Sequence, residues 1–250
     1  MIRLIRAEFL KLRTTQVWFW LLLGAVAVTA LLVVAQLAPH DAVRSELDVY
    51  NVFTSSGTAY VVVFVLGVLG VTTEYRYETI TPTVLATPSR WALVTAKMIT
   101  YALVGAAFAL TCVIVQLAIA LPWLSAKNIH VSLGSNHIPA ALLGVFLVVA
   151  LFGIVGLGFG ALVRNQIVAV SVGVVFLLVI QNILPAIPGL KYAFPYMPGG
   201  AVAAIFTVVG SRDVNGATLF PPAGGVVLLL LWAFVPAILG AAFTLNRDIT

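Results

Sequence analysis

Charged residues are scarce in this chain of 250 residues, of which 8% are Asp, Glu, Lys or Arg and 62% are hydrophobic. Six stretches contain no charged residue at all: 16–36, 49–73, 98–126, 138–163, 165–190 and 214–246. About 20 apolar residues in a helix span the hydrocarbon core of a bilayer. A soluble domain of this size could not bury so much apolar surface and still face water. The sequence therefore predicts a polytopic membrane protein.

Motifs for catalysis, metal binding and nucleotide binding are also missing. There is no G-x-x-x-x-G-K-[ST] phosphate loop, and His40, His130 and His137 lack metal-ligand spacing. The single Cys112 excludes an intramolecular disulfide. No predicted span carries an acidic residue or a histidine, although a serine-based intramembrane enzyme stays open. We therefore expect no catalytic residue, no metal site and no cofactor in this chain.

The uncharged runs predict an all-α fold, because backbone polar groups in lipid must be hydrogen-bonded within their own segment. Short connections indicate one membrane domain over residues 1–250, with residues 1–16 ahead of a six-span bundle over residues 17–250. We expect spans at 17–37, 52–73, 91–121, 138–163, 166–184 and 223–245. Residues 192–211 are also uncharged, but two prolines and two glycines break their first half. This segment predicts an external or re-entrant helix, and the alternative is a seventh span.

The distribution of basic residues predicts the orientation. Nine lie on one side of the predicted membrane and four on the other. The larger group is Arg3, Arg6, Lys11, Arg13, Arg76, Arg90, Lys97, Arg164 and Arg247; the smaller is Arg44, Lys127, Lys191 and Arg212. The positive-inside rule then places both termini in the cytoplasm. This topology explains the net charge of +5 without a nucleic-acid partner.

Residues 1–16 have the pattern of an amphipathic helix. Ile2, Ile5, Phe9 and Leu12 recur at steps of three and four residues, so they share one face. Arg3 and Lys11 would project from the opposite face, with Arg6 and Arg13 at the flanks. We expect an interfacial helix lying in the headgroups with its apolar face toward the lipid. The alternative is a basic tail that only fixes the topology.

The segment 74–97 is the most polar predicted cytoplasmic loop. Thr81 before Pro82 and Thr87 before Pro88 each place a capping hydroxyl ahead of a proline. The residues between them could form one helical turn that presents Val84 and Leu85 to a partner. Glu74, Arg76 and Glu78 precede this turn at the expected membrane edge. The alternative is that these charges merely keep the hairpin inside.

Four segments resemble bacterial ABC exporter permeases of the type-2 class. They are Arg-Ala-Glu-Phe-Leu-Lys-Leu-Arg-Thr-Thr (6–15), the loop 74–97 with Glu-x-x-x-Glu-Thr and Leu-Ala-Thr-Pro-Ser-Arg, Gly-Leu-Gly-Phe-Gly-Ala-Leu-Val-Arg-Asn-Gln (156–166), and Asn-Arg-Asp-Ile-Thr (246–250). Their order and spacing along the whole chain carry the resemblance. One departure is Glu78-Thr79, where that family often has Gly-Thr.

The resemblance implies a permease that pairs with a second permease, identical or related, and with two copies of a cytoplasmic ATP-binding subunit. ATP and Mg²⁺ would bind in that ATPase. It also implies that the loop forms a short coupling helix on the ATPase. The implied contact residues are Glu74, Arg76, Glu78, Thr81, Val84, Leu85 and Arg90.

The resemblance further implies that the second and fifth spans line a substrate path. The residues concerned are Tyr60, Phe64, Phe176, Gln181 and Asn182. Ordinary helix packing explains the same positions equally well. An apolar lining would suit a hydrophobic or amphiphilic substrate such as a drug, an antibiotic or a lipid-like molecule. The function implied is export across the plasma membrane by alternating access, and the alternatives are a membrane-embedded enzyme or a non-transporting sensor or scaffold.

Overall fold

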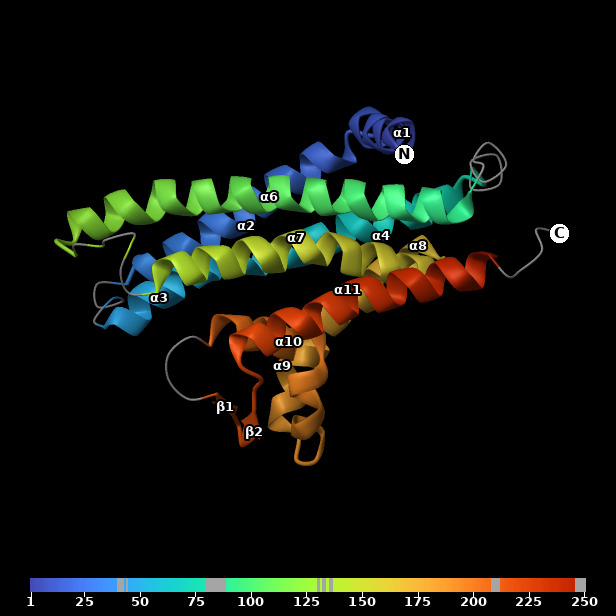
Figure 1. Cartoon of the computed structure of the whole chain (residues 1–250). Helices are drawn as coiled ribbons and strands as arrows, with labels where there is room; N and C mark the ends of the chain where they lie inside the picture. The colour runs from blue at the N-terminus through green and yellow to red at the C-terminus, as the bar shows by residue number, and fades with distance from the viewer. Residues whose placement is uncertain are drawn as a thin grey trace.

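The computed structural model describes residues 1–39, 43, 45–79, 89–129, 131, 134, 137–207 and 212–245. Almost all regular structure in them is helical (Figure 1). The helices are α1 (Ile2–Thr14), α2 (Val17–Leu37), α3 (Glu46–Thr54), η1 (Ser55–Ala59), α4 (Tyr60–Arg76), α6 (Arg90–Ala126), α7 (Ile138–Val163), α8 (Gln166–Val175), η2 (Phe176–Ile180), α9 (Gln181–Ile183), η3 (Leu184–Ala186), η4 (Leu190–Tyr196), α10 (Pro198–Phe206) and α11 (Pro222–Leu245). The all-α prediction is confirmed.

Six helical segments are long and apolar enough to cross a membrane, as predicted. They are Val17–Leu37, Glu46–Arg76, Trp91–Ala126, Ile138–Val163, Gln166–Ala186 and Pro222–Gly240. The second is built from α3, η1 and α4, and η1 is a short 3₁₀ turn made mostly of small residues. The fifth runs from α8 through a π-helical turn, η2, into α9. These six segments make the chain a multi-pass membrane protein.

The helix α7 lies at the centre of the bundle, between α4, α6 and α11 (Figure 1). Glycines let α4 and α7 approach each other closely: a Cβ at Gly67 would overlap the carbonyl of Gly153, and one at Gly160 would lie 2.9 Å from the carbonyl of Val68. Small residues at a helix interface allow this close packing inside a membrane. The α7 window is 61% buried, whereas that of α2 is 17% buried. The second and fourth spans are therefore the core of the bundle, and α2 is peripheral.

The segment that could have formed a seventh span is too short in the structure. Helix α10 has nine residues, or about 14 Å at the rise of an α-helix. It packs against α11, and the indole Nε1 of Trp232 donates a hydrogen bond of 2.9 Å to the carbonyl of Tyr196. Figure 1 shows α9 and the turns after it leaving the direction of the bundle, with α10 beside α11. The prediction of six spans is therefore confirmed.

A two-stranded hairpin between α10 and α11 was not predicted. Strand β1 (Asp213–Val214) pairs antiparallel with β2 (Ala217–Thr218). The turn residues Asn215 and Gly216 have φ of +54° and +81°. An Asn-Gly pair is the strongest short-range signal for such a turn, so the sequence did contain the information.

The ends of several helices gather at one end of the bundle. Figure 1 shows α1 there, together with the C-terminal end of α4, the start of α6 and the end of α11. Helix α3 and the end of α6 lie at the opposite end. The first group contains most of the basic residues, and we call it the α1 end.

Candidate functional site

Four charged side chains meet in a buried cluster at the α1 end. The Nζ atom of Lys97, on α6, lies 2.8 Å from Oε2 of Glu8 on α1 and 2.7 Å from Oε1 of Glu74 on α4. The Nζ atom of Lys11, on α1, lies 2.8 Å from Oε1 of each of the two glutamates. The four groups form a closed ring of alternating charge. We call them the charge cluster.

The cluster is largely removed from solvent. Glu8, Lys97 and Glu74 are 3%, 6% and 7% exposed, and Lys11 retains 44% of its side-chain exposure. Buried charges are costly unless they are paired and hydrogen-bonded, and here two ammonium groups balance two carboxylates. The arrangement therefore holds only while α1, α4 and α6 all contribute their partners.

The pKa values of the two α1 residues follow from this pairing. Burial alone would raise the pKa of Glu8, but the charge of Lys97 and hydrogen bonds from Lys11 and Lys97 outweigh it, so the pKa lies below its ordinary value. Burial alone would lower the pKa of Lys11, but hydrogen bonds to Glu74 and Glu8 raise it above its ordinary value. Both groups are thus held in their charged forms.

Local sequence explains how the cluster closes. Glu8 and Lys11 are three residues apart, so they share one face of α1. Gly70 on α4 leaves room for Tyr101 of α6, because a Cβ at Gly70 would collide with that ring. The Nζ of Lys97 also lies 3.4 Å from the carbonyl of Gly70. A cavity of about 350 Å³ adjoins the cluster, with Glu8, Lys11, Glu74 and Tyr101 in its wall.

The ion pairs give two residues of α1 a role that the sequence pattern did not predict. Glu8 contacts Lys97 and Lys11 contacts Glu74, so the side of α1 next to its apolar face packs against the bundle. Ile2 on the apolar face is 70% exposed, and the placement of that face in the lipid stays a prediction. The sequence pattern places Lys97 only among the basic residues that set the orientation, whereas the structure buries it in the charge cluster. A lysine within the apolar start of a span indicates a buried partner of opposite charge, and this is the feature of the sequence that predicts the pairing of Lys97.

The predicted coupling residues fall into three groups. Glu74, at the end of α4, is buried in the charge cluster and so does not present a free carboxylate at the surface. Arg76 and Glu78 are exposed, and Nη1 of Arg76 lies 3.4 Å from Oε1 of Gln166. Three of the remaining predicted residues lie outside the described residues: Thr81, Val84 and Leu85. Arg90 is the first residue of α6, but its side chain is not described. The coupling role of these residues stays a prediction.

The turn at the end of α4 shows why glycine would suit position 78. This residue has a φ of +55°, in the left-handed region that favours glycine. The amide of Thr79 donates to the carbonyl of Glu74 at 3.0 Å, and the amide of Glu78 donates to the carbonyl of Tyr75 at 3.3 Å. This pattern is typical of a glycine-terminated helix. The Gly-Thr expected from the family resemblance therefore fits the observed turn.

The residues assigned to the substrate path occupy different surroundings. Tyr60 lines a cavity of about 490 Å³, and its ring lies 4.3 Å from that of Phe152. Phe64 is 3% exposed and packs 5.7 Å from the ring of Phe159. Phe176 is half-buried against the main core. Their role in transport stays a prediction.

The two polar members of that set are hydrogen-bonded to backbone. The buried Gln181 accepts a hydrogen bond from the amide of Gly199 at the start of α10, which ties the fifth span to that helix. The exposed Asn182 donates to the carbonyl of Leu178 at 2.7 Å. Gln181 thus joins two helices, and the role of Gln181 and Asn182 in a substrate path stays a prediction.

A comparison with family models finds the ABC-2 family transporter protein, matched over residues 4–182. The match includes every residue of the charge cluster and stops before α10, the hairpin and α11. No curated protein matches the chain. Members of this family are membrane subunits that work with an ATP-binding ABC subunit. Since the match covers more than half of its length, the chain belongs to the ABC-2 family of transporter proteins.

Proposed function

We propose that this chain is the permease subunit of an ATP-driven exporter and that the charge cluster transmits the movement of the ATPase. The observation that carries this proposal is the pairing of Lys97 with Glu8 and Glu74. Glu74 on α4 and Lys97 on α6 lie on the two helices that flank residues 80–88 in the sequence. Glu8 links the third helix, α1, to this pair. A force applied to that loop would therefore reach three helices together.

The packing of α4 supports a route from this end into the bundle. Helix α4 contacts α7 through the glycines described above, and α7 contacts α6 and α11. Closely packed helices shift as rigid units because their interiors resist deformation. Tilting α4 at the charge cluster would thus move the core of the bundle. This movement is the basis of alternating access in our proposal.

The partners follow from this mechanism. We infer two copies of a cytoplasmic ATPase, which bind ATP and Mg²⁺, and a second permease that is identical or related. The α1 end faces the cytoplasm, in agreement with its excess of basic residues, and the chain lies in the plasma membrane. Closure of the ATPase pair on ATP would push on the loops of both permeases.

The cavity at Tyr60 suggests the class of substrate. Asn51, Thr54 and Thr58 give it a polar side, while Tyr60 and Phe206 give it an aromatic side. Sites with a few polar groups on an apolar wall bind molecules that have both characters. We infer an amphiphilic or hydrophobic substrate that leaves the cell through this part of the bundle.

Charge reversal at Glu78 tests the coupling. In the reconstituted complex with the ATPase, Glu78→Lys should abolish substrate-stimulated ATP hydrolysis, because a reversed charge repels a complementary partner. Its thermal unfolding in detergent should stay near that of the wild type, since the side chain is exposed. Glu46→Lys reverses another exposed glutamate, on α3 at the opposite end; it is the matched control and should keep coupled hydrolysis.

Two further variants separate the possible results. Glu78→Gly removes the charge but suits the left-handed turn. If this variant keeps full coupling while Glu78→Lys loses it, the loss in Glu78→Lys is caused by charge repulsion and not by the loss of a specific ion pair. Tyr60→Ala should change the preference among substrates and leave basal hydrolysis intact. Full substrate-stimulated hydrolysis in Glu78→Lys would refute the role of this turn in coupling.

A further inference from the structure

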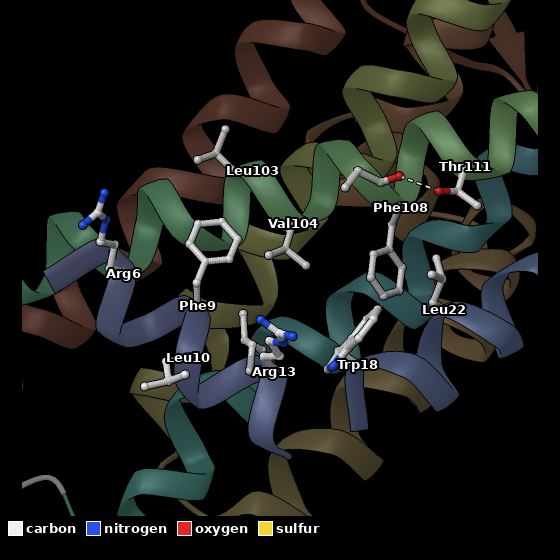
Figure 2. Close-up of a pocket in the computed structure, with 12 residues that line it drawn as sticks. Arg6, Phe9, Leu10, Arg13, Trp18, Leu22, Leu103, Val104, Phe108 and Thr111 are labelled. Atoms are coloured by element: carbon white, nitrogen blue, oxygen red, sulfur yellow. Dashed lines mark hydrogen bonds between the residues drawn. The ribbon is translucent and has the colours of Figure 1, made fainter. Parts of the chain in front are cut away.

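A third cavity, distinct from those at the charge cluster and at Tyr60, opens between α1, α2 and α6 (Figure 2). Its volume of about 460 Å³ lies within the range of small-molecule sites, roughly 300–1,000 Å³. The three helices that form it come from the N-terminal segment and from the first and third spans. It therefore lies where an amphipathic helix meets two membrane-spanning helices.

The walls of this cavity are almost entirely apolar. Helix α1 contributes Phe9, α2 contributes Trp18 and Leu22, and α6 contributes Leu103 and Phe108. Figure 2 shows the ring of Phe9 directed toward Leu103 and Val104, and the rings of Trp18 and Phe108 close to each other. The hydroxyl of Thr111 donates to the carbonyl of Ala107 within α6, at 2.9 Å. These surfaces suit a hydrocarbon chain.

Two arginines on α1 give the cavity its charge. Arg6 and Arg13 both line it, and they are seven residues apart, so they lie two turns apart on the same face. Within the described residues, neither guanidinium forms an ion pair with a carboxylate, whereas Lys11 is neutralised in the charge cluster. Figure 2 shows Arg6 beside Phe9, and Arg13 between Leu10 and Trp18. The cavity therefore combines an apolar interior with two free cationic groups.

We propose that this cavity binds an anionic phospholipid of the surrounding bilayer. The phosphate contacts Arg6 and Arg13, and one acyl chain runs along the apolar walls formed by α2 and α6. Guanidinium groups bind phosphate oxygens in a bidentate manner, and basic pockets between membrane helices recognise anionic headgroups. The charge and the lining are thus complementary to the two parts of one lipid.

This lipid site goes beyond the coupling function. Helix α1 presents Glu8 and Lys11 to the bundle on one face, while Arg6 and Arg13 face the cavity. A bound lipid would contact α1, α2 and α6 together. The anionic lipid content of the membrane would thereby influence how firmly α1 is docked.

Quenching of Trp18 by brominated lipids tests the proposal. The full chain, with Trp20, Trp91, Trp123 and Trp232 replaced by Phe, would be reconstituted in vesicles containing brominated phosphatidylglycerol or brominated phosphatidylcholine with the same acyl chains. Bromine quenches tryptophan only at short range, so Trp18 reports the occupant of the cavity. We expect phosphatidylglycerol to be preferred by about tenfold, given the attraction of two basic groups to an anionic lipid. Equal quenching by the two lipids would overturn the proposal.

Three variants of the same protein locate the two parts of the lipid. Arg6→Gln/Arg13→Gln should remove the preference, while Arg3→Gln, a substitution of an exposed arginine that does not line the cavity, should retain it. Ala107→Phe should reduce quenching by both lipids, because its ring would fill the apolar part. An unchanged preference in the double variant, or unchanged quenching in Ala107→Phe, would contradict the assignment. Absence of quenching by either lipid would mean that a protein segment fills the cavity, which would also refute it.

Discussion

Two buried polar contacts join the second and third spans, one toward each end of the bundle, and they differ in kind. At the α1 end, Lys97 on α6 is paired with Glu74 on α4 and with Glu8 on α1. Toward the opposite end, the side-chain amide of Gln116 on α6 donates to the carbonyl of Val52 at 2.6 Å and accepts a hydrogen bond from the hydroxyl of Ser56. The first contact is ionic and includes a third helix. The second is neutral and joins only two spans.

The difference concerns how much each contact depends on its partners. A buried charge without its partner carries a large desolvation cost, whereas an unpaired amide carries a smaller one. The ionic contact is therefore stable only when α1 packs against α4 and α6, whereas the neutral contact does not depend on the position of α1. A joint that holds only when three helices are in place is suited to transmit a movement. The neutral contact is ordinary helix packing inside a membrane.

The largest effect should come from removing the shared cation. Lys97→Met keeps much of the side-chain volume but leaves Glu8 and Glu74 with Lys11 alone. We expect a loss of about 3–5 kcal/mol in the free energy of unfolding, which is typical when one partner of a buried ion pair is removed. Denaturant unfolding of the purified full chain in detergent would measure it.

A double variant sharpens this result. Glu8→Gln/Lys97→Met removes one charge of each sign and leaves Glu74 paired with Lys11, so it should cost less than the sum of the two single changes. Additive losses would show that Glu8 and Lys97 do not depend on each other. The docking of α1 through the charge cluster would then be incorrect.

A second, smaller effect should appear in acid. The pKa of Glu8 is lower in the folded protein than its ordinary value of 4.5, so its contribution is fully present above that value and is lost as the pH falls through the folded pKa. The pKa of Lys11 is raised above 10.5, so its contribution is present below that pH and is lost as the pH rises through the folded pKa. The unfolding temperature of the wild type should thus fall as the pH drops below 4.5. Glu8→Gln should lose part of this acid dependence, and an identical pH profile in the variant would exclude Glu8 as its source.

The spans and the charge cluster differ in how far the sequence predicts them. Each span is encoded in one continuous apolar run, so length and composition suffice to find it. The partners of Lys97 lie 23 and 89 residues away along the chain. No local pattern connects such distant residues, and a lysine near the start of a span has the same appearance as a surface anchor. The pairing results from the packing of α1 against α4 and α6 in the folded chain.

The neutral contact was partly predictable for a similar reason. A glutamine inside a span is costly in lipid, so the position of Gln116 in the third span indicates that it faces other helices, and the structure buries it completely. Its partners could not be named, because Val52 and Ser56 precede it by 64 and 60 residues. Sequence thus indicates that a buried polar group has a partner, and packing decides which one.

The smallest effect should come from the neutral contact. Gln116→Leu removes an amide that contacts Val52 and Ser56 but leaves no buried charge, and leucine fills most of the space. Hydrogen bonds between membrane helices contribute about 0.6 kcal/mol on average and reach about 1.7 kcal/mol, so the loss in unfolding free energy should lie in this range. Ser56→Ala is the matched change on the other side, and the double variant should cost little more than Gln116→Leu alone because the two share one hydrogen bond. The acid dependence assigned to Glu8 should persist in Gln116→Leu, since neither Gln116 nor Ser56 titrates. A loss as large as that of Lys97→Met would remove the distinction between the two ends, because the neutral contact would then be as essential as the ionic one.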